Sequence, residues 1–251
     1  MSAAHELVHL SRELGREERH LAMLGEGNTS TDLGDGTFLV KASGTSLATL
    51  TTEGLSRVSH AKVDAILGKK HVTEEEIEEG LVACLADATH KKPSVETFLH
   101  SICLRQPGVK WVGHTHTTSV LSVLASKQGA KPFLRHVCPD AIVVCGRHVL
   151  PIPYINPGLD LARAVQDGLS RFRAEHGKPP KVILMENHGP VALGASSTEV
   201  LNIMLMLDKW ARVLLGTFIA GGPNYLPEEE AARIDERLDE AYRRKMIEAK
   251  A

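Results

Sequence analysis

Two short runs rich in apolar residues each lead into a motif that contains histidine. Residues 109–112 precede His114 and His116, and residues 182–185 precede His188. Such short runs, bounded by polar motifs, are typical of buried strands. Side chains two positions apart on a strand point to the same face, so His114 and His116 can reach one ion. If the two strands end side by side, His188 becomes a third ligand, and three histidines leave coordination positions open for catalysis.

Length and composition favour one large domain, expected to span residues 1–251. The 251 residues are 43% hydrophobic with a formal net charge of -2, and no basic block invites nucleic acid. No apolar stretch reaches about 18 residues, and the N-terminus lacks the charged and apolar regions of a signal peptide. We therefore expect a cytoplasmic protein with no membrane partner. The four cysteines form no CxxC pair, which favours reduced thiols over disulfides.

Helices and short strands alternate along the chain without a repeat. Thr73 and Glu76 match a capping box, Ser94 is predicted to cap the following helix, and Asp35-Gly36 is a favoured hairpin turn. Helices are predicted over about 4–24, 55–67, 73–89, 94–105, 119–125, 159–175, 198–219 and 228–249. Strands are predicted on both sides of the hairpin turn to about residue 40, and over about 109–112, 141–145 and 182–185. This alternation alone favours a parallel sheet.

A carboxylate and two loops of small polar residues accompany the histidines. Glu96 follows Pro93-Ser94-Val95 at a predicted helix start, where it can be a fourth metal ligand or a general base, or can simply favour the helix start. The loops at residues 25–30 and 41–46 carry glycine, serine and threonine. Their amides and hydroxyls can hold a phosphate, although the same residues form ordinary turns, and no Walker pattern is present.

Taken in order, these motifs resemble the class II aldolase and adducin head family, in particular its L-fuculose-phosphate aldolase-like members. The resemblance covers about residues 6–215 and rests on Gly27-Asn28-Thr29-Ser30, Ser43-Gly44, Pro93-Ser94-Val95-Glu96 with His100, His114-Thr115-His116 and Asn187-His188-Gly189. It implies a three-layer α/β/α sandwich with a largely antiparallel central sheet. It also implies a divalent metal, usually zinc with manganese or cobalt as alternatives, and a homotetramer with active sites at subunit interfaces.

The resemblance also implies roles for individual residues. The metal ligands would be His114, His116 and His188, and Glu96 would be the catalytic acid/base that also approaches the metal. A substrate phosphate would be held by Asn28, Ser43, Gly44 and Ser94.

Two assignments are less direct. Val95 stands where the sugar-phosphate aldolases often carry a second serine, so one hydroxyl donor is missing, for which Thr45 or Ser46 can compensate unless the substrate differs. Asp140 lies near the position that the 4-epimerase branch uses as a second acid/base, and Tyr154 is another candidate. Asp140 can equally end a turn before the strand predicted at 141–145.

The implied function is that of a lyase in carbohydrate metabolism. The resemblance predicts a metal-dependent class II aldolase that cleaves a ketose 1-phosphate, such as a deoxy sugar phosphate, to dihydroxyacetone phosphate and an aldehyde through a metal-stabilised enediolate. Sugar-phosphate 4-epimerisation, decarboxylation of a 3-oxo sugar acid phosphate and dehydration of methylthioribulose phosphate are alternatives on the same scaffold. A non-enzymatic alternative is an adducin-like binding module, which lacks the metal ligands. The segment also resembles the aldolase part of longer proteins with a dehydrogenase domain, but it contains no GxGxxG motif.

Overall fold

A mixed sheet forms the centre of the fold. The computed structural model describes residues 2–237, and within them seven strands pair in the order β3-β2-β1-β4-β7-β6-β5. Neighbouring strands are antiparallel except for β5 and β6, which are parallel. The largely antiparallel sheet implied by the resemblance is therefore confirmed. In chain order the strands are β1 (Asn28–Asp32), β2 (Thr37–Lys41), β3 (Leu55–Ser59), β4 (Trp111–His114), β5 (Leu150–Ile152), β6 (Val182–Met185) and β7 (Gly189–Gly194).

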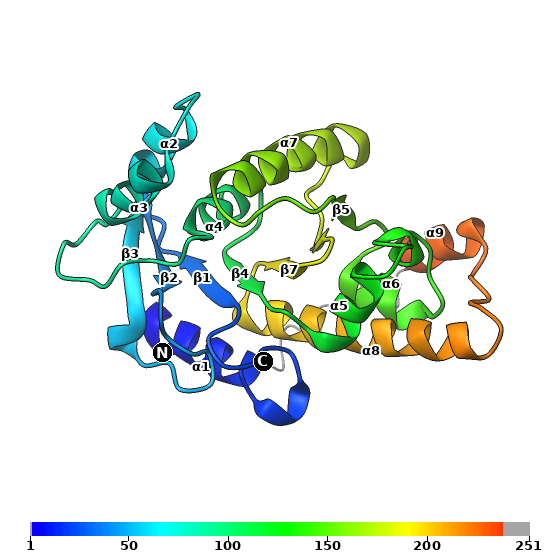
Figure 1. Cartoon of the computed structure of the whole chain (residues 1–251). Helices are drawn as coiled ribbons and strands as arrows, with labels where there is room; N and C mark the ends of the chain where they lie inside the picture. The colour runs from blue at the N-terminus through cyan, green and yellow to red at the C-terminus, as the bar shows by residue number, and fades with distance from the viewer. Residues whose placement is uncertain (1, 238–251) are drawn as a thin grey trace.

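Helices cover both faces of the sheet. They are α1 (Ala3–Leu14), α2 (His60–Leu67), α3 (Glu74–Ala83), α4 (Thr97–Leu104), α5 (Thr118–Leu124), α6 (Pro139–Cys145), α7 (Leu159–His176), α8 (Ser197–Ile219) and α9 (Glu228–Glu236). Figure 1 shows α1 and α8 below the sheet and α4 and α7 above it. The fold is thus the expected three-layer α/β/α sandwich. No helix within residues 2–237 is long and apolar enough to cross a membrane.

Each face of the sheet has its own apolar core. Along β6, Val182 and Leu184 belong to the core that α1 and α8 cover, whereas Ile183 and Met185 belong to the core that α4 and α7 cover. Both faces of β6 are therefore buried, which explains why its sequence is an unbroken apolar run rather than an alternating one.

The strand predicted at residues 141–145 is wrong, because this segment is helix α6. Pro139 lies in the first turn and Asp140 adds an acidic side chain there, and both features favour a helix start. Ala141, Ile142 and Cys145 are fully buried. Five consecutive apolar residues fit a buried helix as well as a buried strand, so periodicity alone could not separate the two.

Several predicted element bounds also need correction. The helix predicted over 4–24 ends at Leu14, and residues 55–59 form a strand before the helix that follows them. The capping box at Thr73 is confirmed, but its helix ends at Ala83 rather than near residue 89. Ser94 is not the cap of α4, since that position belongs to Glu96. The last helix ends at Glu236 within the described residues, and residues 238–249 of its predicted span lie outside them.

Candidate active site

The first two histidines leave the sheet at the end of β4. His114 is the last residue of the strand, paired with Asn28 on β1 and with Val191 on β7, and His116 follows two positions later. The Nδ1 atom of His114 lies 2.9 Å from the carbonyl oxygen of Pro190, which can only accept a hydrogen bond. The Nδ1 atom therefore carries the proton, and the lone pair of Nε2 faces His116 Nε2 at 3.1 Å.

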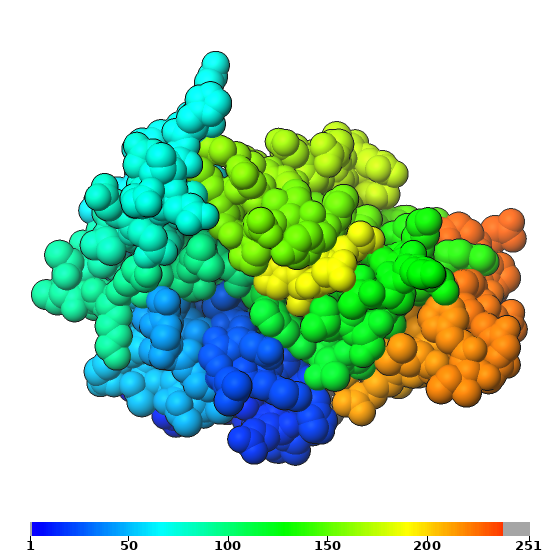
Figure 2. Space-filling view, in the orientation of Figure 1, coloured from blue at the N-terminus to red at the C-terminus, as the bar shows by residue number. Residues whose placement is uncertain are grey.

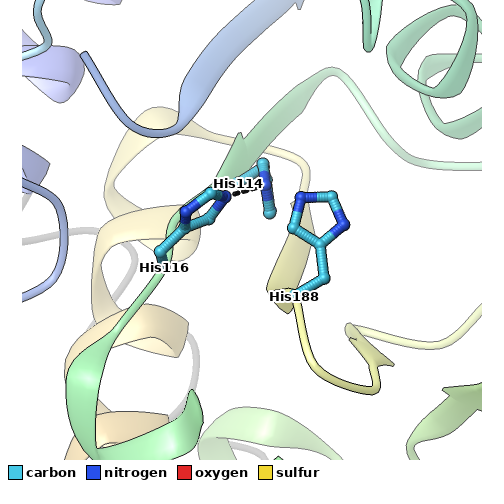
Figure 3. Close-up of side chains that lie close together, drawn as sticks. All are labelled: His114, His116 and His188. Atoms are coloured by element: carbon cyan, nitrogen blue, oxygen red, sulfur yellow. Dashed lines mark hydrogen bonds between the residues drawn. The ribbon is translucent and has the colours of Figure 1, made fainter. Parts of the chain in front are cut away.

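His188 reaches the same place from a tight turn. Strand β7 lies between β4 and β6, so the two strands predicted to end side by side are not direct neighbours. Instead, the chain turns back after β6 and carries His188 on the turn, next to the end of β4 (Figure 3). Asn187 adopts a left-handed φ of 55° there. A Cβ atom at Gly189 would lie 2.3 Å from the carbonyl oxygen of Thr115, so only glycine permits this approach.

The three imidazoles converge as metal ligands do. One nitrogen from each of His114, His116 and His188 lies within 4.8 Å of the others, and the rings meet edge-on with centroids 4.8 to 5.0 Å apart (Figure 3). The geometry thus brings together the three histidines that the sequence singled out.

Glu96 completes the donor set from the start of α4. Its Oε2 atom lies 3.4 Å from His114 Nε2, and its Oε1 atom lies 3.2 Å from His188 Nε2. Among the described residues, no donor is aligned for a hydrogen bond to Oε1, although the atom is buried. Three imidazoles beside a carboxylate oxygen of this kind form a donor set that fits a divalent cation such as zinc.

The electrostatics of the site agree with that fit. Burial acts to raise the pKa of Glu96, but His114, His188 and the Asn28 amide outweigh it and hold the pKa well below the usual range. Glu96 is therefore a carboxylate. Burial lowers the pKa of His114 to about 4 despite the nearby carboxylate, which keeps this imidazole neutral and able to donate its lone pair.

A small polar cavity opens beside these groups. Its volume is about 290 Å³. The end of β2 and the residues after it line the cavity. They are held to residues 92–94 by a β-bridge between Ala42 and Pro93 and by a 2.9 Å hydrogen bond from the Ser43 amide to the carbonyl of Lys92. Among the residues predicted for the site, the cavity is lined by Asn28, Ser43, Gly44, Ser94, Glu96, His116 and His188. Thr45 and Ser46, considered as substitutes for a serine at Val95, do not line it.

Lys41 was missed by the sequence reasoning. It lines the cavity and is only 3% exposed, and its Nζ donates to the carbonyl of Thr45 at 2.6 Å. Burial lowers the pKa of Lys41, and the Glu96 carboxylate opposes that shift. A lysine that ends the run Phe38-Leu39-Val40 directly before a serine and glycine loop was the available signal. The residue gives the cavity a buried cation.

The two candidates for a second proton donor lie elsewhere in this chain. Asp140 is in the first turn of α6, where its carboxylate lies 3.2 Å from Lys209 Nζ, and it does not line the cavity. Tyr154 lies between β5 and α7, about half exposed, and its hydroxyl donates to Asn156 at 2.8 Å. Pro157, farther along that loop, does line the cavity. The space-filling view shows blue, green and yellow segments adjoining on one surface, so regions distant in sequence share this face (Figure 2).

The fold and the histidine cluster together define an α/β/α sandwich domain that can hold a divalent metal ion at three histidines. The model of the class II aldolase and adducin N-terminal domain matches residues 5–215, and the chain belongs to this family. Class II aldolases use a divalent metal, and the histidine cluster is where this chain can hold one.

Individual relatives differ in what they are named for. The chain is 26% identical over 244 residues to the uncharacterized oxidoreductase YuxG of Bacillus subtilis, covering 91% of this chain but only 33% of that protein. It is 29% identical over 225 residues to a 3-oxo-tetronate 4-phosphate decarboxylase of Pectobacterium atrosepticum, covering 86% of each. A solved L-fuculose 1-phosphate aldolase is similar in fold, with a TM-score of 0.70, 18% identity, and coverage of 94% of this chain and 96% of that one.

Proposed function

We propose that this chain is a metal-dependent carbon–carbon lyase that acts on a small phosphorylated sugar derivative, with zinc as the expected cation. The observation that carries the proposal is the convergence of His114, His116 and His188 on Glu96 at the edge of a cavity. A cavity of about 290 Å³ lies at the lower end of the range for ligand pockets, which suits a small metabolite. Retention of the full donor set argues against an adducin-like binding module.

The residues divide the chemistry between them. A divalent cation held by the three histidines would act as a Lewis acid, stabilising the negative charge that develops on substrate oxygens when a carbon–carbon bond breaks. We assign proton transfer to Glu96, whose carboxylate oxygens lie 3.4 Å from His114 and 3.2 Å from His188. It would deliver a proton to the enediolate carbon, or in the reverse direction remove one from the same carbon of the keto form. Lys41, with the amides and hydroxyls of Ser43, Gly44 and Ser94, would bind the phosphate.

Two bond cleavages fit this division. In retro-aldol cleavage of a ketose 1-phosphate, the C4 hydroxyl gives its proton to the second acid/base, the C3–C4 bond breaks, the aldehyde leaves, and the electron pair remains in the enediolate of dihydroxyacetone phosphate. In decarboxylation of a 3-oxo sugar acid phosphate, carbon dioxide leaves and the same kind of enediolate remains. Either enediolate gains one proton at carbon. We assign this delivery to Glu96, which as a carboxylate would first take that proton from solvent.

The comparisons favour decarboxylation. Relatives named 3-oxo-tetronate 4-phosphate decarboxylase are 28% to 29% identical and match along most of their length, whereas the aldolase named above is 18% identical and supports the fold alone. A 4-epimerase is a further reaction that reuses the aldol cleavage. The same proposal includes a homotetramer with interfacial active sites and a cytoplasmic location. It also includes a second proton donor at Asp140 or Tyr154.

The test is a two-substrate assay on zinc-loaded protein. A panel of ketose 1-phosphates is screened for dihydroxyacetone phosphate release, and 3-oxo-tetronate 4-phosphate is screened for carbon dioxide release. We expect His116→Ala to lose metal and turnover together, and Glu96→Gln to keep metal and lose turnover. Glu78→Gln is the matched control, because Glu78 also lines the cavity but is exposed and paired with Lys92. Full turnover in both His116→Ala and Glu96→Gln would refute the site.

A further inference from the structure

A line of buried side chains leads from β1 to Glu96. Ser30 Oγ lies 2.6 Å from His100 Nδ1, and His100 Nε2 is hydrogen bonded to Asn28 Oδ1. The Nδ2 atom of Asn28 then donates to Glu96 Oε2 at 2.6 Å and to Ser94 Oγ at 3.2 Å. Ser30 and His100 are fully buried, and Asn28 is 3% exposed, so bulk water offers these groups no alternative partners. Their hydrogen bonds must be made with one another.

The directions of these hydrogen bonds follow from the carboxylate at the end of the line. The Asn28 NH₂ donates to Glu96 Oε2 and to Ser94 Oγ, which leaves its Oδ1 to accept from His100. His100 must then donate from Nε2, which leaves Nδ1 to accept from the Ser30 hydroxyl. Burial lowers the pKa of His100 to about 3, so the ring is neutral and carries the one proton that this arrangement needs.

We infer that Ser30 and His100 are positioning residues that fix the orientation of the Asn28 amide and, through it, the Glu96 carboxylate. His100 lies one helical turn after Glu96, and the structure connects the two side chains through Asn28. The inference rests on the proposed function only in assigning proton transfer to Glu96.

The amide of asparagine has two orientations of nearly equal shape, and only its partners select one. Without the His100 donor, the Asn28 amide can rotate and place its oxygen against Glu96, where two acceptors repel each other. The carboxylate would then move away from the place of proton transfer. None of His114, His116 and His188 contributes to this line, so cation binding by the histidines is expected to persist.

A matched pair of serine variants tests the inference. Ser30 and Ser101 are both fully buried, and each hydroxyl bonds a histidine Nδ1, at 2.6 Å to His100 and at 2.7 Å to His60. We expect Ser30→Ala to lower kcat about 10–100-fold, in the range of other groups that orient a metal site. Its KM and bound zinc should stay near wild type. Ser101→Ala should leave kcat unchanged while losing a comparable amount of thermal stability.

Variants of His100 separate positioning from packing. His100→Gln keeps a side-chain donor for Asn28 Oδ1 and should recover much of the kcat that His100→Leu loses. Equal kcat losses in both, or equal kcat effects of Ser30→Ala and Ser101→Ala, would overturn the inference in favour of a structural role. Loss of bound zinc in Ser30→Ala would overturn it as well.

A spectroscopic arm works without any substrate. In protein labelled with ¹⁵N-histidine, long-range proton–nitrogen correlation should show His100 protonated at Nε2 and unprotonated at Nδ1 at neutral pH. Ser30→Ala should weaken this preference for one tautomer. An Nδ1-protonated or charged ring would overturn the inference, whether or not the wild-type protein is active. Lack of activity on both substrate classes would instead count against the proposed function.

Discussion

Gly27→Ala is the substitution whose effect the structure defines most sharply. Gly27 directly precedes β1 and has a left-handed φ of 70°. A Cβ atom there would lie 2.6 Å from the carbonyl oxygen of His114 and 3.1 Å from a methyl group of Leu47. Gly34, just beyond the other end of β1, has a φ of 75°, yet a Cβ atom there would meet nothing within 4 Å. The two glycines therefore share a backbone conformation and differ only in how closely other atoms approach the place of a Cβ atom.

The magnitude follows from that difference. A left-handed conformation costs a residue with a side chain about 1–2 kcal/mol, and this cost applies to both alanine variants. The contact with the His114 carbonyl adds overpacking of about 1–3 kcal/mol at Gly27 only. Loss of backbone freedom in the unfolded chain is the same for both and cancels. We expect Gly34→Ala to lower the free energy of unfolding by about 1–2 kcal/mol and Gly27→Ala by about 2–5 kcal/mol.

Urea unfolding of the metal-free proteins, followed by tryptophan fluorescence, measures this difference. The midpoint should fall further for Gly27→Ala, with an unchanged dependence on urea. A chelator competition should also show weaker zinc binding by Gly27→Ala, because the displaced carbonyl belongs to His114, one of the proposed ligands. Equal midpoints for the two variants would refute the close packing of the chain before β1 against the end of β4.

Three further perturbations address the site and its surroundings. Lys41→Met should raise KM for a phosphorylated substrate about 10–100-fold, the value of one charge-assisted hydrogen bond, with bound zinc unchanged; an unchanged KM in steady-state kinetics would remove Lys41 from the phosphate site. Zinc at about 100 times its Kd should add about 2.7 kcal/mol of stability that chelation removes, measured by thermal unfolding with and without chelator, and His116→Ala should abolish this gain. The third concerns pH: the pKa of His100 is about 3 in the fold against about 6.5 when unfolded. Below pH 6.5 the unfolded chain thus binds a proton that His100 in the fold does not, and the contribution of His100 to stability should fall by about 1.4 kcal/mol per pH unit as pH drops from there toward 3. Urea midpoints of His100→Gln should fall less steeply.

Capping motifs and apolar patterns in the sequence predicted several elements correctly. The Thr73 capping box, the apolar run of β6 and the long amphipathic α8 all lie where the sequence placed them. Strand β7, with the sequence Gly-Pro-Val-Ala-Leu-Gly, was not predicted, because glycine and proline are poor strand formers. It is nevertheless buried along its whole length, between β4 and β6. Its place is decided by packing on both faces, which a local reading of the chain cannot detect.

The candidate site divides in the same way. Strand geometry predicted the pairing of His114 with His116, although β4 ends at His114 and His116 lies just beyond it. Their approach to His188 was expected from the motifs. Lys41 and the route from His100 through Asn28 depend on the packing of α4 over β1 and on the turn after β2. The hydrogen bonds that connect β1 with α4 join residues 68 to 72 positions apart, so spacing in the sequence carries no trace of them.

Strand β1 carries polar side chains in the middle of the sheet, and their hydrogen bonds explain why. Its sequence, Asn-Thr-Ser-Thr-Asp, has little apolar character, yet its first four residues are at most 3% exposed and the strand lies between β2 and β4. Buried polar groups of this kind destabilise a fold unless each finds a partner. Thr29 bonds Ser11 on the α1 side, whereas Asn28 and Ser30 bond His100 on the α4 side. An apolar strand would fill the same place without this need for partners. The polar face toward α4 is therefore best explained by the carboxylate that it orients, since stability alone does not require it.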